Sequence, residues 1–228
     1  MPNLKNLKDR LKKIPELRSE RKLSASFGVY TIKIAQSKEK IAKAYRDMEY
    51  IDRVFPEAEC KKKILPVIKE SVKKAKKIYQ LIEADPQTVK KISTENSVIK
   101  INDYAKSAST KCHDIWNLEI TNTVSKWEKL AAVIQGLGAK GGHEFKKAVE
   151  GLKNRQIPKN DDEVTQVKNG QKELQKGIAN LALEGPFGKF LEATVAGGAS
   201  PKDLLRPEIK DKLDEFNLWD SFKIRLGQ

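Results

Sequence analysis

The sequence has few of the residues on which most enzyme chemistry depends. It contains only two histidines and two cysteines, and these four residues form neither a CxxC pair nor a cluster with metal-ligand spacing. Neither GxSxG nor HExxH occurs, and no Cys/His pair is arranged for nucleophilic catalysis. We therefore predict a protein without catalytic activity that binds no metal ion and no cofactor.

Long apolar runs are also missing. No segment approaches the roughly 18 consecutive apolar residues that a membrane span needs, and no apolar stretch of a signal peptide follows the first lysines. The two cysteines, Cys60 and Cys112, lie far apart in the sequence. A disulfide between them is geometrically possible, but reduced thiols in a cytoplasmic protein are the expectation.

Aromatic residues amount to 7% of the chain and apolar residues to 39%, whereas charged residues amount to 33%. Such a chain has enough apolar residues for a thin core only. Helical bundles have this balance, since each helix buries a narrow stripe. The sequence therefore predicts an all-α fold, an elongated antiparallel bundle or coiled coil with a small compact helical unit at the C-terminus.

Positive charge predominates, and it is unevenly distributed. The formal net charge is +14, and residues 1–83 hold 22 basic residues against 11 acidic ones. A field of this sign attracts nucleic acid, anionic lipid or an acidic protein surface. The alternative interpretation is that the lysines only keep the helix surfaces soluble.

Two amphipathic segments open the chain. In residues 3–17, an apolar face of Leu and Ile is accompanied by lysines that include Lys12 and Lys13, a pattern that suits a membrane surface, a partner or the cap of a bundle. In residues 19–55, apolar residues recur in a heptad register, which is typical of a coiled-coil or bundle helix. The heptad residues are Phe27, Tyr30, Ile34, Ile41, Ala44, Met48, Ile51 and Phe55, with Ser37 as a polar interruption.

Residues 57–84 are predicted to form the next helix, with Pro56 in its first turn. Pro66 either kinks this helix or shifts its start to about Leu65. The apolar stripe consists of Ile64, Ile68, Ala75, Ile78 and Ile82, widened by Leu65, Val72 and Tyr79. At about 100° per residue, the opposite face holds Lys62, Lys69, Lys73 and Lys77, with Lys76 at its edge.

This basic face is the principal candidate site in the sequence. Lysines act as point charges on phosphates, and no aromatic side chains alternate with them, so any nucleic-acid binding here would not depend on base sequence. An acidic protein partner and a merely solvated helix face are the alternatives.

Residues 86–136 contain no proline after Pro86 and no glycine before Gly136. If helical throughout, these roughly 50 residues form a rod on the order of 75 Å long. One sevenfold set is Ile92, Ile99, Lys106, His113, Ile120, Trp127 and Ile134, and a second is Ile101, Ala108 and Ile115. The polar residues expected at buried heptad positions are Asn96, Asp103, Ser107 and Asn122. His113 is expected to be a hydrogen-bonded core residue rather than a metal ligand.

A literal GxGxxG occurs in Gly136–Gly142, but the dinucleotide fingerprint requires a strand before it, and a helix is expected there instead. We predict a hinge or a hairpin tip that ends the long helix. Helices are predicted over residues 144–152 and 161–183, where Gly170 and Gly177 indicate either close helix packing or local weakness.

Aromatic residues concentrate after Pro186. Ser200 is expected to cap a helix at its start and Asn217 to cap one at its end, and residues 221–226 alternate like an edge strand or an extended peptide. The predicted domains are residues 1–143 and 144–228. The predicted partner-docking residues are Phe187, Phe190, Trp219, Phe222 and Ile224.

Three functional hypotheses follow from these patterns. The first is a non-catalytic accessory or adaptor subunit of a larger intracellular complex, whose basic face contacts nucleic acid or an acidic protein. The second is a protein that binds DNA or RNA on its own, independently of base sequence. The third is a membrane-active helical protein that inserts residues 131–142.

The far-UV circular dichroism spectrum should be dominated by α-helix, because every long segment of the chain is predicted to be helical. A spectrum dominated by β-structure would contradict the all-α prediction.

Overall fold

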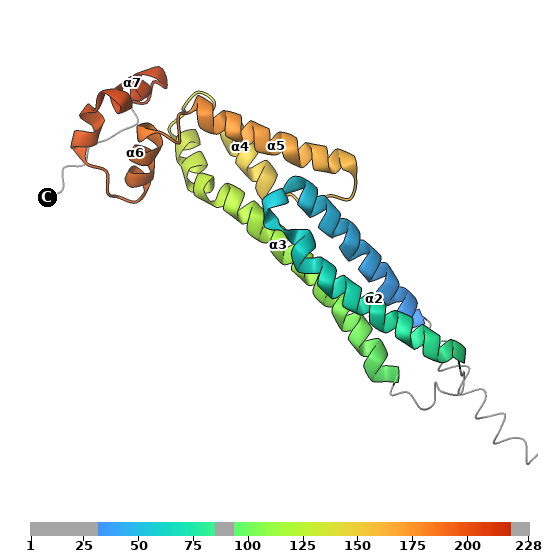
Figure 1. Cartoon of the computed structure of the whole chain (residues 1–228). Helices are drawn as coiled ribbons and strands as arrows, with labels where there is room; N and C mark the ends of the chain where they lie inside the picture. Colours follow the sequence, from blue (N-terminus) through green and yellow to red (C-terminus); the bar gives the residue numbers. More distant parts are fainter. Residues whose placement is uncertain (1–31, 85–93, 220–228) are drawn as a thin grey trace, which may run out of the picture. The chain divides into compact units, whose positions relative to one another are not determined.

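A computed structural model describes residues 32–84 and 94–219 (Figure 1). All regular secondary structure in these residues is helical, which confirms the all-α prediction for this part of the chain. Residues 32–54 are helical. They are followed by η1 (Pro56–Ala58), α2 (Cys60–Ala84), α3 (Thr94–Gly136), α4 (Gly142–Lys153), α5 (Asp161–Asn180), α6 (Pro186–Val195), η3 (Pro201–Leu205) and α7 (Pro207–Glu215). The predicted segments 3–17 and 221–226 lie outside the described residues.

The described residues divide into two compact units. The first contains residues 32–52, 59–84 and 94–114, and the second contains residues 53–58 and 115–219. The helix α3 therefore contributes to both units, and the predicted boundary at residue 143 falls inside the second. The elongated antiparallel arrangement and the coiled coil stay predictions.

The heptad register predicted for residues 19–55 accounts for burial in the first unit. Ile34, Ala44, Met48 and Ile51 are each at most 3% exposed. The polar interruption, Ser37, is also buried, and its hydroxyl donates to the Lys33 carbonyl at 2.9 Å. Its burial therefore leaves no unsatisfied polar group, which would otherwise cost stability.

The start of α2 differs from the prediction. Pro56 begins the short 3-10 helix η1 rather than α2 itself. The helix α2 then begins at Cys60, where the Asp52 carboxylate accepts a hydrogen bond from the Lys61 amide at 3.1 Å. It continues through Pro66, so a start near Leu65 is wrong. Proline has no amide hydrogen and removes one bond of the helix without ending it.

Residues 32–52, α2 and the first half of α3 lie side by side in the first unit (Figure 1). Ile34, Ile78 and Ile101 form a shared cluster, one residue from each helix. The Ser71 hydroxyl donates to the Ile101 carbonyl at 3.2 Å, and the Cys112 thiol donates to the Ala44 carbonyl at 3.5 Å. Other buried positions carry small side chains, and small side chains let helix axes approach closely. These positions are Ala44, Ala105 and Ala108.

The buried face of α3 departs from the predicted sevenfold set in the first unit. Ile99, Lys106 and His113 are exposed, whereas Ile101 and Cys112 are buried. The predicted core role of His113 is therefore wrong, and Asp103, Ser107 and Asn122 are exposed as well. A straight helix drifts about 20° per heptad. A set that is buried at Ile120, Trp127 and Ile134 thus rotates out of the core toward the N-terminal end of α3.

The second unit has a core of large side chains. The rings of Trp127 and Phe145 meet edge to face, with centroids 6.4 Å apart. The indole of Trp116 packs against the ring of Phe55, with ring centroids 5.4 Å apart. Its N–H donates a hydrogen bond to the Arg155 carbonyl at 2.9 Å. Aromatic pairs of this geometry add to the stabilisation from burial alone.

The glycine-rich segment forms the tight turn between α3 and α4. Gly138 and Gly141 have φ angles of 73° and 85°, a conformation that other residues adopt at a cost. The Ala139 amide donates to the Ile134 carbonyl at 3.2 Å and ends α3. The predicted end of the long helix at this segment is confirmed.

Close helix packing, rather than local weakness, explains the two glycines of α5. A Cβ added at Gly177 would lie 2.8 Å from Cδ2 of Phe145, and one at Gly170 would lie 3.0 Å from Cδ2 of Leu152. The side chains of α4 therefore occupy the space that a larger residue in α5 would fill.

The C-terminal helices pack through aromatic residues. The rings of Phe187 in α6 and Phe216 after α7 lie 5.7 Å apart. Ser200 caps η3, which is a 3-10 helix, in a capping box with Asp203. Asn217 has a φ of 54° directly after α7, and this left-handed residue confirms the predicted C-terminal cap.

Gly188→Ala should lower the free energy of unfolding by more than about 2 kcal/mol, because the added Cβ would lie 1.8 Å from the Leu183 carbonyl oxygen. Gly151→Ala is the matched control, since no heavy atom lies within 4 Å of its added Cβ. This control should stabilise α4 by up to about 1 kcal/mol through helix propensity alone. Urea unfolding measures the free energy of unfolding of both variants. Equal changes of the same sign would contradict the close approach of Gly188 to Leu183.

Candidate functional site

The basic face of α2 is oriented by the residues on its opposite side. The helix contains eight lysines and two glutamates. Ile64, Ile68 and Ile78 are at most 5% exposed, so they fix the rotation of α2 in the first unit. Because the lysines lie roughly opposite these isoleucines at about 100° per residue, they face solvent.

The structure bears out the exposure of this face. Lys62, Lys69, Lys73, Lys76 and Lys77 are all exposed, and the side chains of Lys62 and Lys73 are 76% and 80% exposed. Lys74 is only partly exposed, and its ammonium lies 5.5 Å from the ring centroid of Tyr104 in α3. The other two predicted lysines, Lys12 and Lys13, lie outside the described residues.

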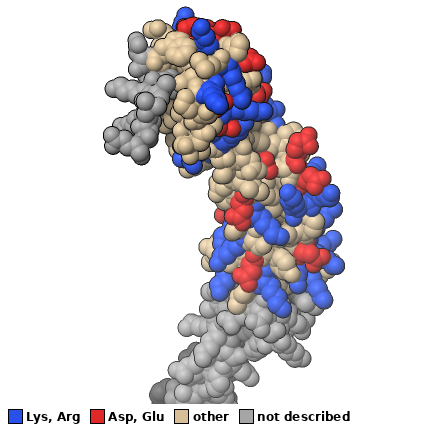
Figure 2. Space-filling view, turned by 90° about the vertical axis from the view of Figure 1, so that its left-hand side faces the viewer, with Lys and Arg blue, Asp and Glu red and all other residues tan. Residues whose placement is uncertain are grey.

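Two carboxylates neutralise part of this charge. The Lys62 ammonium lies 3.2 Å from the Glu59 carboxylate, and the Lys73 ammonium lies 4.0 Å from that of Glu70. Exposed pairs of this kind contribute little and exchange readily with other anions. Figure 2 shows acidic side chains lying between basic ones on the visible surface.

The chemistry of the α2 face is that of point charges. Residues 61–78 contain neither arginine nor an aromatic residue. Bidentate recognition of phosphate needs arginine, and base stacking needs a planar side chain. The face is therefore suited to anions in general, without selecting one base or one oxyanion geometry.

A buried polar cluster in the first unit is a second feature, which the sequence did not indicate. Asp47 is 8% exposed, and Cys60 and Cys112 are fully buried. The hydrogen bond with Cys60, burial and the nearby Asp47 carboxylate all raise the pKa of the Cys112 thiol. A thiol of this kind is neutral and a poor nucleophile. Among residues 32–84 and 94–219, no group of three or more His, Cys, Asp or Glu could hold a metal ion.

Asp47 itself is incompletely paired. Its Oδ2 atom is buried and has no hydrogen-bond partner. Burial raises the pKa of this carboxyl group, although Lys43, His113 and Arg46 oppose the shift. An ionised carboxylate at this position therefore costs the first unit stability.

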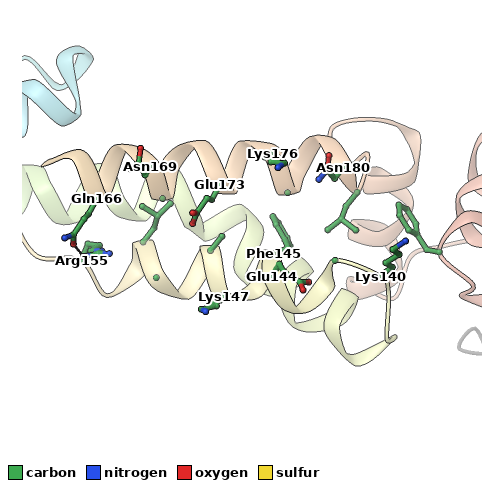
Figure 3. Close-up of a pocket in the computed structure, with 18 of the residues that line it drawn as sticks. Lys140, Glu144, Phe145, Lys147, Arg155, Gln166, Asn169, Glu173, Lys176 and Asn180 are labelled. Carbon is green, nitrogen blue, oxygen red and sulfur yellow. Dashed lines mark hydrogen bonds between the residues drawn. The ribbon is translucent and has the colours of Figure 1, made fainter. Parts of the chain in front are cut away.

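A groove of about 1020 Å³ runs along α4 and α5 in the second unit (Figure 3). Gly151, Gly170 and Gly177 are among the residues that line it, so the presence of Gly170 and Gly177 in one predicted helix was the available sequence signal. The Arg155 guanidinium donates to the Gln166 side chain across it at 2.9 Å. The groove is lined by both acidic and basic residues, which do not favour one class of ligand. These charged residues are Lys140, Glu144, Lys147, Arg155, Glu173, Lys176 and Glu215.

The predicted docking residues of the C-terminal region are only partly available. Phe187 and Phe190 are 3% and 5% exposed, so they belong to the core and the prediction of a docking role for them is wrong. Amphipathic α6 buries the face on which both lie. Trp219 is 39% exposed and its indole donates to Asp214. Phe222 and Ile224 lie outside the described residues.

Comparison with protein-family models, curated proteins and solved structures finds no match for this chain. Within the described residues, every helix is too short or too polar to cross a membrane.

Asp47→Asn should raise the free energy of unfolding by about 1 kcal/mol at neutral pH, because it removes the buried charge. The folded protein raises the pKa of Asp47 above 3.8, so the native state binds this proton more tightly than the unfolded chain. The proton-linked stabilisation of the wild type is full below pH 3.8 and is lost as the pH rises through the raised pKa. The advantage of the variant should therefore shrink in acid.

Urea unfolding at several pH values measures this difference. Asp103→Asn is the control, because Asp103 is exposed on α3. A loss of stability in Asp47→Asn at neutral pH would show that the carboxylate is favourably paired.

Proposed function

We propose that the protein is a non-catalytic, cytoplasmic accessory subunit of a larger complex, and that it binds an anionic partner through the basic face of α2. The observation that carries this proposal is the exposure of five lysines on one helix face, opposite buried isoleucines. These lysines are Lys62, Lys69, Lys73, Lys76 and Lys77. The anionic groups of the partner are phosphates of nucleic acid or carboxylates of a protein.

Binding is driven by charge and by the release of counterions. Each lysine that replaces a bound counterion makes affinity fall as salt is added, and surface charges are screened beyond about 10 Å at 0.1 M salt. Because α2 is held in one rotation by its buried isoleucines, all five ammonium groups are presented together. Glu59 and Glu70 release Lys62 and Lys73 at little cost when a stronger anion arrives.

Reversal of Lys62, Lys69, Lys73 and Lys77 to Glu should weaken binding to duplex DNA and to poly-glutamate on the order of 100-fold at low salt. All four side chains are exposed, so helicity and the melting temperature should change little. Fluorescence anisotropy across a salt series measures the affinity.

The matched control reverses Lys168, Lys172, Lys202 and Lys210, which are exposed in the second unit. It makes the same change in net charge but leaves α2 intact, so it should retain most of the affinity. Equal losses in the two variants would show that only the net charge matters, and a wild-type protein that binds neither polyanion would refute the proposed function.

A further inference from the structure

The solvent face of α2 contains apolar side chains among its lysines. Val72 is 50% exposed, and Leu65 is partly exposed. Together with the lysines they form a series in which Lys and an apolar residue alternate at spacings of three and four. We call this series the mixed seam; it consists of Lys62, Leu65, Lys69, Val72 and Lys76.

The mixed seam is distinct from the stripe that α2 buries. The buried stripe contains Ile64, Ile68 and Ile78, whereas Val72 projects beside it toward solvent. Residues three and four apart on a helix are neighbours on its surface. Val72 therefore lies between Lys69 and Lys76 on the outer surface.

A spacing of three and four residues is the pattern by which one helix packs along another. Two seam positions are apolar and three are cationic, so a matching helix would carry apolar residues and carboxylates in the same alternation. A phosphate backbone has no apolar group to cover Leu65 and Val72. Burying the exposed half of Val72 in a protein partner, by contrast, adds hydrophobic stabilisation.

We propose that the mixed seam binds an acidic amphipathic helix of another protein. Carboxylates of that helix face Lys62, Lys69 and Lys76, and its apolar residues cover Leu65 and Val72. The inference rests on the proposed function and names its partner. The seam spans about 21 Å of helix, so the partner needs at least about two heptads.

Charge argues against two other occupants of the mixed seam. A second copy of α2 would bring its lysines against those of the first, and like charges in contact oppose association. The segment of residues 3–17 of this same chain is also basic. An acidic partner removes this repulsion, and Lys73 and Lys77 can contact further carboxylates at its edge.

The test uses the full chain and two synthetic acidic peptides of about three heptads. The matched peptide places Leu and Glu in the alternation that complements the mixed seam, and the scrambled peptide has the same composition without seven-residue spacing. Val72→Ser should weaken binding of the matched peptide about tenfold and leave binding of poly-glutamate unchanged. Ile99→Ser is the control, because Ile99 is 49% exposed on α3, outside the seam.

The expected result is tight binding of the matched peptide, weaker binding of the scrambled one, and a loss in Val72→Ser alone. Equal affinity for the two peptides, or no loss in Val72→Ser, would overturn the assignment of a helix while leaving the anion-binding function intact. Tighter binding of duplex DNA or of anionic vesicles than of the matched peptide, at the same salt, would assign the seam to that surface instead. If the protein bound none of these anions, the proposed function would be refuted as well.

Discussion

Burial of one isoleucine stripe fixes the orientation of α2, and the position of the basic face depends on it. Ile64, Ile68 and Ile78 contribute roughly 25 cal/mol for each Å² of apolar surface that they bury. A rotation of α2 that exposed them would forfeit this contribution and bury lysines, at a much larger cost. The position of every charged side chain on α2 therefore follows from the apolar side chains behind it.

The cores of the two units differ in the size of the side chains that they bury. The first unit packs its helices over small residues such as Ala44 and Ala108 and tolerates the buried Asp47. The second unit buries large side chains, among them Trp116 and Phe145. A thin bundle leaves most of each helix circumference at the surface. The first unit therefore offers a long charged face, while the second has the larger apolar core.

Periodicity predicted the parts of the fold in which one helix face is buried along its length. It identified Met48 and Ile51 as core, and Lys69 as exposed. It failed in α3, because a sevenfold set drifts relative to a straight helix and leaves His113 at the surface. The concentration of aromatic residues near Phe187 suggested a docking surface, but such residues are as suitable for a core, where Phe187 lies. The contact of Cys112 with Cys60 depends on tertiary packing that no local pattern contains.

Thiol labelling along α2 tests the orientation of this helix most directly. Single cysteines placed from residue 62 to residue 78 would be labelled under native conditions, with Cys60 and Cys112 as the unreactive background, because both are fully buried. If the isoleucine stripe orients α2, the labelling rates follow a helical period, with fast labelling at Lys69 and Lys73 and slow labelling at Ser71. Uniform rates, or slow labelling at the lysine positions, would contradict it.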